Sequence, residues 1–77
     1  MFLVQVHDRQ YRFSGVGVTI EKAASDLFKH FRPEQLVINS ENTRVFHKCD
    51  RQGRLALLPE KDMPAALQIV SNAYNQS

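Results

Sequence analysis

Two short runs in which apolar and polar side chains alternate open the chain. Residues 2–7 and residues 11–14 both show the period of two that is typical of half-buried β-strands. Residues 8–10 between them are turn-forming, so the pattern predicts a first hairpin. Gly15 and Gly17 follow the second run, and glycines there predict either a β-bulge or a close approach of another backbone segment.

The next segment changes to the spacing of an α-helix. Thr19 can cap the helix because its hydroxyl can accept a hydrogen bond from a free backbone N–H, and Pro33 stops it. Lys29 and His30 complement the negative end of the helix dipole, so we expect a helix over residues 19–32. Its apolar stripe consists of Ile20, Ala23, Ala24, Leu27, Phe28 and Phe31.

Three further apolar runs predict three more strands. Residues 35–39 are apolar on both faces, as an interior strand would be. Residues 43–49 alternate with period two, and residues 55–58 form the last run. A hairpin turn joins these two, and Gly53 is expected to adopt a positive φ in it.

A second helix is expected over residues 62–75, with Asp62 as its cap and Pro64 tolerated in its first turn. Its apolar stripe is Met63, Ala66, Leu67, Val70 and Tyr74. The order of elements is therefore ββαβββα, which predicts one α+β domain spanning residues 1–77. We expect a two-layer sandwich with a mostly antiparallel sheet and both helices on one face. The predicted core is Val4, Val6, Phe13, Leu27, Phe28, Phe31, Ile38, Leu57, Leu67 and Val70.

The strand over residues 43–49 has no face that is easily buried. Arg and Lys side chains are almost never fully buried without a partner, so Arg44 and Lys48 should point to solvent, and Phe46 must point the same way. A sandwich with helices on one face leaves the other face open for these side chains. The residues expected to share that face are Leu3, Gln5, His7, Arg12, Arg44, Phe46 and Lys48.

Charge supports a contact surface in this region. The formal net charge is +2, and residues 41–58, with four cations and two anions, carry a local charge of the same size. Such an asymmetry either attracts an acidic partner or is simply the solvated edge of a hairpin. The predicted binding residues are Arg44, Phe46, Lys48, Arg12, Arg51 and Arg54.

Catalytic, metal and cofactor chemistry has little support in the residues. His47 and Cys49 lie two positions apart, but no third orienting group accompanies them, and a lone free cysteine is commonly a small buried residue. His7, His47 and Cys49 supply only one short pair, whereas zinc usually takes four ligands. We therefore expect no enzymatic activity, no metal site and no cofactor.

Two classes of binding function fit the predicted face. An exposed Phe with flanking Arg is typical of protein interfaces, and a small chain without a catalytic constellation often acts as an adaptor or inhibitor, for instance in prokaryotes and phages. Association with a second copy would also stabilise so short a domain. The alternative is nucleic-acid binding, in which Phe46 stacks on a base and the cations hold phosphates.

The predicted order over residues 19–74 also matches the αβββα order of double-stranded-RNA-binding domains. However, Glu60 and Asp62 stand where such a domain would present lysines. We therefore expect a protein partner first and nucleic acid as the alternative. Because the chain has a single cysteine and no apolar run that could span a bilayer, we expect no membrane contact and a cytoplasmic setting.

Overall fold

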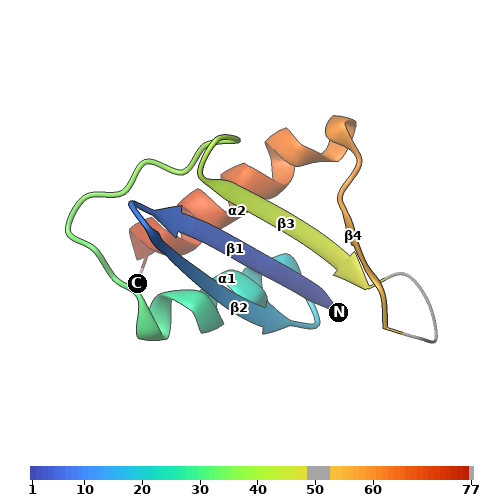
Figure 1. The fold of residues 1–77 in the computed structure, drawn as a ribbon, viewed down its shortest axis with the longest axis horizontal. Helices are drawn as coiled ribbons and strands as arrows, with labels where there is room; N and C mark the ends of the chain where they lie inside the picture. The colour runs from blue at the N-terminus through green and yellow to red at the C-terminus, as the bar shows by residue number, and fades with distance from the viewer. Residues whose placement is uncertain (49–52, 77) are drawn as a thin grey trace.

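A four-stranded antiparallel sheet with two helices on one face forms the domain (Figure 1). The computed structural model describes residues 1–48 and 53–76. Its elements are β1 (Phe2–Asp8), β2 (Tyr11–Gly17), α1 (Ile20–His30), β3 (Thr43–Lys48), β4 (Leu55–Leu57), a 3-10 turn η1 (Glu60–Asp62) and α2 (Met63–Gln76). The strand order is β2-β1-β3-β4, and no described helix covers the second face of the sheet, here called the outer face. The predicted α+β class is confirmed.

Helix α1 begins and ends for the reasons that the sequence indicates. The Thr19 hydroxyl accepts a hydrogen bond from the Lys22 N–H at 3.1 Å. At the other end the backbone turns extended at Phe31, two residues before Pro33, so that the Phe31 side chain still enters the core.

Gly15 and Gly17 allow α1 to lie directly on β2. A Cβ atom on Gly15 would overlap the carbonyl oxygen of Ala23 and the backbone nitrogen of Leu27, and one on Gly17 would lie 2.5 Å from the nitrogen of Ala23. The β1–β2 register is unbroken from one end to the other, so there is no bulge. Of the two predicted roles for these glycines, the close backbone approach is correct and the bulge is wrong.

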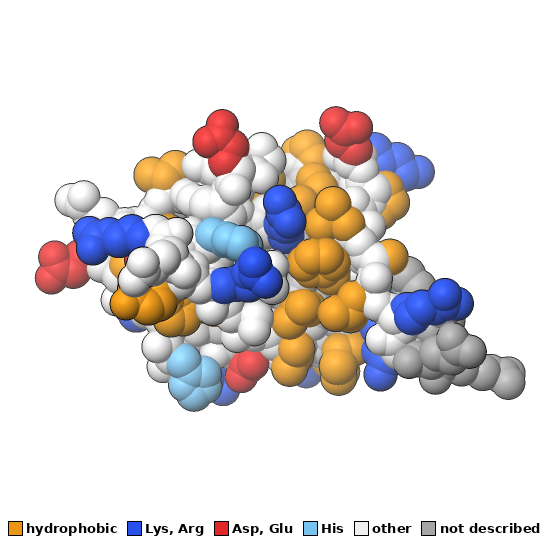
Figure 2. Space-filling model, in the orientation of Figure 1, with side chains coloured by type: hydrophobic (Ala, Val, Ile, Leu, Met, Phe, Trp, Pro, Cys, Tyr) orange, Lys and Arg blue, Asp and Glu red, His pale blue; other side chains and the backbone are white. Residues whose placement is uncertain are grey.

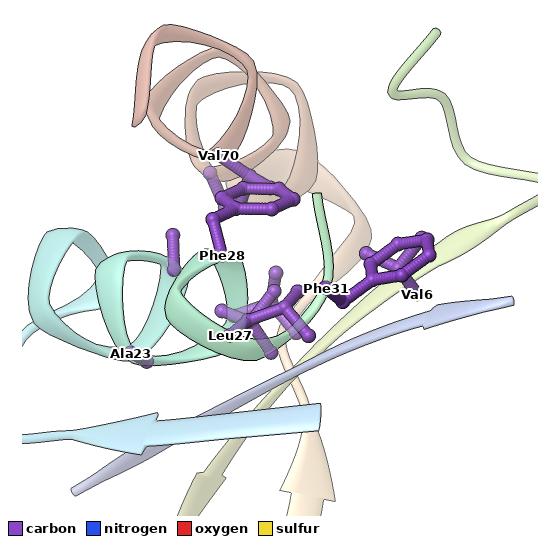
Figure 3. Close-up of a cluster of buried hydrophobic side chains, with 10 residues drawn as sticks. Val6, Ala23, Leu27, Phe28, Phe31 and Val70 are labelled. Atoms are coloured by element: carbon purple, nitrogen blue, oxygen red, sulfur yellow. The ribbon is translucent and has the colours of Figure 1, made fainter. Parts of the chain in front are cut away.

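The core fills the space between the inner face of the sheet and the two helices. Figure 3 shows Phe28 directed from α1 toward Val70 of α2, whereas Phe31 lies beside Val6 of the sheet. The buried apolar residues are Val4, Val6, Ala23, Ala24, Leu27, Phe28, Phe31, Val45, Ala66 and Val70. Phe13 and Ile38 are partly buried and pack against this cluster.

The prediction that Leu57 belongs to the core is wrong, because its side chain is 52% exposed. The register of β3 and β4 pairs Leu57 with Phe46, and both side chains point to the outer face. The next residue, Leu58, packs against the core in its place. Leu67 on α2 is likewise only partly buried.

The prediction of a strand over residues 35–39 is also wrong, since this segment is irregular. The side chains of two asparagines form hydrogen bonds with backbone groups in this segment and just after it. The side-chain oxygen of Asn39 accepts hydrogen bonds from the N–H groups of Glu41 and Asn42, at 2.9 and 3.0 Å. The side chain of Asn42 accepts from the Asn39 N–H at 3.1 Å and donates to the Val37 carbonyl at 2.6 Å. Asn and Asp side chains commonly compete with strand pairing in this way.

The observed order of elements is therefore ββαββα, with η1 before the last helix. This removes the αβββα order that residues 19–74 were expected to share with double-stranded-RNA-binding domains. Asp62 belongs to η1, in which its N–H bonds the carbonyl of Pro59 at 2.9 Å, and α2 begins one residue later.

The C-terminal end of α2 is fastened to the segment after α1. The Tyr74 hydroxyl donates to the carbonyl oxygen of Pro33 at 2.6 Å, and the Arg32 guanidinium donates to the Tyr74 carbonyl at 3.0 Å. The same guanidinium lies 5.2 Å from the centre of the Tyr74 ring. These contacts hold the end of α2 against the segment that follows α1. Within the described ranges, neither helix has the length and apolar character needed to cross a membrane.

Candidate functional site: the outer face of the sheet

The register of the strands places four apolar side chains in one row across the outer face. Val4 of β1 and Val45 of β3 are opposite each other and buried, so their neighbours Leu3 and Phe46 must point outward. Leu3 is paired with Val16 of β2 and with Phe46, and Phe46 is paired with Leu57 of β4. The row is therefore Val16, Leu3, Phe46 and Leu57.

A second row lies beside the first, toward the start of β1. Lys48 pairs with Leu55, and its N–H donates to the carbonyl oxygen of Met1 at 3.0 Å. Continuing the β1–β2 register by one position puts Val18 on the other side of Met1. All members of this row except Lys48 are apolar. Together the two rows form the apolar band, which is Met1, Leu3, Val16, Val18, Phe46, Leu55 and Leu57.

Much of the apolar band is accessible to solvent. The exposed fractions are 62% for Val18, 56% for Met1, 52% for Leu57, 51% for Leu55 and 50% for Val16. Figure 2 shows the band as a continuous orange area that crosses the outer face of the sheet. Single exposed apolar side chains are ordinary, whereas a continuous group on one face indicates a contact surface.

The other half of the outer face is polar and basic. Gln5 is paired with Ser14 and with Arg44, and His7 is paired with Arg12. These five residues, Gln5, His7, Arg12, Ser14 and Arg44, are called the basic half below, and Figure 2 shows blue and pale-blue side chains beside the orange area. No carboxylate points outward from any of the four strands, so every full charge on the described outer face is positive.

The predicted binding residues are only partly brought together. Arg44, Phe46 and Lys48 point outward from β3, as expected, and Arg12 lies on the same face. Strand β1 lies between Arg12 and Arg44, so these two guanidinium groups do not form a cluster. Arg54 is exposed just before β4, and Arg51 is outside the described residues.

The surroundings of Phe46 differ from the expected pair of cations. Its neighbours across the sheet are Leu3 and Leu57, and the ring is half-buried between these strands. The contribution of Val16, Leu55 and Leu57 to the surface was missed. The period-two positions of Leu55 and Leu57 were a usable signal, because they place both side chains on the same face of β4.

A shallow hollow opens at the corner where β4 separates from β3. Leu57, Leu58 and Met63 provide its apolar side, and Arg44 and Glu60 provide its charged side. The hollow is continuous with both halves of the outer face, because Leu57 belongs to the apolar band and Arg44 to the basic half.

His7 and His47 lie at opposite ends of the sheet. His7 lies near the end of β1, opposite Arg12, whereas His47 lies at the far end of β3 with its ring 5.1 Å from that of Phe2. Across residues 1–48 and 53–76, no three His, Cys, Asp or Glu side chains are close enough to hold a metal ion. Cys49, the proposed partner of His47, is outside the described residues. The Nε2 atom of His7 is buried and has no hydrogen-bond partner in the described structure.

Comparisons of this chain with protein-family models, with curated proteins and with solved structures found no match in any of the three. Its function must therefore be argued from the outer face itself.

Proposed function

We propose that this chain is a small non-catalytic binding module, of the adaptor or inhibitor type, that contacts another protein through the outer face of its sheet. The observation that carries the proposal is the apolar band, which extends over all four strands. Apolar surface of this extent is unfavourable in water, and covering it by association is favourable in proportion to the area removed from solvent.

The side chains of the apolar band lie outside the buried core of the domain. The core is closed on the inner face by side chains of the strands and of both helices. Val16, Leu55 and Leu57 each leave half or more of their surface in water, so their burial adds little to folding. Residues of this kind are the ones whose burial drives binding, with Phe46 as a central aromatic anchor.

Nucleic-acid binding, the alternative function, has less support from this geometry. A stacking platform presents exposed aromatic rings among cations that hold the phosphates. Here Phe46 is half-buried between Leu3 and Leu57, and β1 separates Arg12 from Arg44. The formal net charge of +2 is also small for a protein that binds phosphates.

Site-specific photo-cross-linking in the source cells tests the proposal. A photoreactive phenylalanine analogue would replace Leu57 in the apolar band, and in a matched control Gln68, an exposed residue on α2. We expect the Leu57 position to give a discrete adduct of higher mass that survives nuclease treatment, and the Gln68 position to give none. Equal labelling from both positions would contradict the proposal, and a nuclease-sensitive adduct would favour nucleic acid.

A further inference from the structure

Building on the proposed protein-binding function, we infer that the partner presents an amphipathic α-helix with an apolar stripe bordered by carboxylates. The helix lies across the strands, over the apolar band, and its carboxylates face Arg44 and Lys48. The inference combines the charge of the outer face, its backbone chemistry, the dimensions of the band and the hollow beside Arg44.

The charge of the outer face selects the charge of the partner. Among the side chains that point outward from the four described strands, the fully charged ones are Arg12, Arg44 and Lys48, and Lys48 lies within the row that contains Met1 and Leu55. A partner that covers this row removes water from around the Lys48 ammonium. Burying a charge is costly unless an opposite charge accompanies it, so the partner must supply carboxylates.

The strands of a second copy, docked face to face, do not supply them. In such a dimer both outer faces would contribute cations, and no carboxylate points outward from the strands of either copy. Such a dimer would bring two Lys48 side chains into an apolar interface without partners. Like charges facing each other oppose association, which argues for a different chain.

The backbone of the outer face selects a helix over an extended segment. The face presents side chains only, because the N–H and C=O groups of β1 and β3 are paired within the sheet. An extended segment lying on it would leave its own backbone groups unpaired, whereas a helix satisfies them internally.

The size of the apolar band fits one short helix. Four strands span about 14 Å between the outermost two, and the two rows of the band are about 7 Å apart. About ten residues of helix cover the first distance, and a helix with its side chains is about 10 Å wide. The band therefore matches the apolar stripe of a helix of about three turns.

The hollow beside Arg44 indicates where one side chain of the partner helix would bind. Leu57, Leu58 and Met63 form an apolar wall that can receive a large apolar side chain of the partner helix. Arg44 and Glu60 both line this hollow, so a carboxylate one turn away on the helix would reach the Arg44 guanidinium from the side of the sheet, away from Glu60. An apolar residue with an acidic residue three or four positions away is thus the expected recognition element.

Two designed peptides of about 18 residues provide the test. Both carry leucine at helical i, i+3, i+4 and i+7 spacing, and the flanking positions are glutamate in one peptide and lysine in the other. Each is titrated into the isotopically labelled full chain and followed by amide chemical shifts. A charge-reversed protein, Arg44→Glu with Lys48→Glu, serves as the matched variant, and a single-stranded oligothymidylate serves as a third probe.

We expect the glutamate peptide to bind the unaltered chain at least tenfold more tightly than the lysine peptide, with shifts on β1, β3 and β4. The charge-reversed protein should show the opposite preference. Equal binding of the two peptides at the apolar band would overturn the acidic helix while leaving the proposed function standing. Binding of neither peptide would also overturn the inference, and the cross-linking experiment would then decide the proposed function separately. Oligothymidylate binding at the same residues would overturn both.

Discussion

Asn42 connects the irregular segment after α1 to the buried start of β3. Its side-chain oxygen accepts hydrogen bonds from the Asn39 N–H and from the Thr43 hydroxyl, at 3.1 and 2.7 Å, and Thr43 is completely buried. Asn42→Ala would leave that hydroxyl without this acceptor. Because an unsatisfied buried polar group costs ~1–3 kcal/mol, we expect a loss of about 2 kcal/mol in the free energy of unfolding, measured with urea.

Asn72→Ala is the matched control for this substitution. Asn72 is exposed on α2 and accepts a hydrogen bond from the Gln68 side chain, one turn earlier. Its loss should change the free energy of unfolding by less than about 0.5 kcal/mol. Equal losses for the two alanine variants would show that the hydrogen bonds of the Asn42 side chain do not stabilise the fold.

At the residue scale, the sequence predicts which way a strand side chain points more easily than it predicts which residues lie beside that side chain. The outward direction of Arg44 and Lys48 followed from the cost of burying charge, and the structure agrees. The neighbours of Phe46 depend on which residues of β1 and β4 lie opposite it. That register is set by contacts between distant parts of the chain, so the alternation of residues within one strand does not predict it.

The packing of α1 on β2 depends on the absence of a side chain at Gly15. Gly15→Ala would force the added methyl group against the backbone of Ala23 and Leu27, which cannot move without shifting the whole helix. Overpacking of this kind commonly costs 1–3 kcal/mol, so we expect a loss of about 3 kcal/mol in thermal or urea unfolding. Ser14→Ala, on the exposed side of the same strand, is the control and should be nearly neutral. A Gly15→Ala protein as stable as the control would exclude this close contact.

The α1–α2 contact is the second element-scale test. Phe28 is 3% exposed and its ring lies 5.3 Å from that of Tyr74. Phe28→Ala should cost ~3–5 kcal/mol, a large part of the stability of so small a domain. Val37→Ala removes an apolar side chain that is 75% exposed and should leave the melting temperature almost unchanged. If both variants melt alike, the core assignment is wrong.

Both helices could be predicted from the sequence because local signals agree with one another. Thr19, the apolar stripe and Pro33 all indicate the same element, and the structure contains it. The apolar composition of residues 35–39 predicts a strand, but the side-chain bonds of Asn39 and Asn42 make the segment irregular. The Asn39 N–H and the Val37 carbonyl of this segment bond the Asn42 side chain instead of a neighbouring strand.

At the scale of the whole molecule, the two binding classes differ in their response to salt. We expect titration with a single-stranded oligonucleotide to give no saturable binding near physiological ionic strength, because the cations on the outer face are few and separated. Saturable binding whose log K falls with log salt by ~0.7 per neutralised phosphate would contradict the ranking of a protein partner over nucleic acid.

The central claim is that the apolar band serves binding and not folding, and one double variant separates the two roles. Val16→Thr with Leu57→Thr keeps β-forming side chains while placing hydroxyl groups on the two ends of the row. We predict that the yield of the photo-cross-linked adduct, now recorded from Leu55, falls at least tenfold in this variant. The free energy of unfolding should change by less than about 1 kcal/mol, since both sites are half exposed. An undiminished adduct in a folded variant would contradict the account.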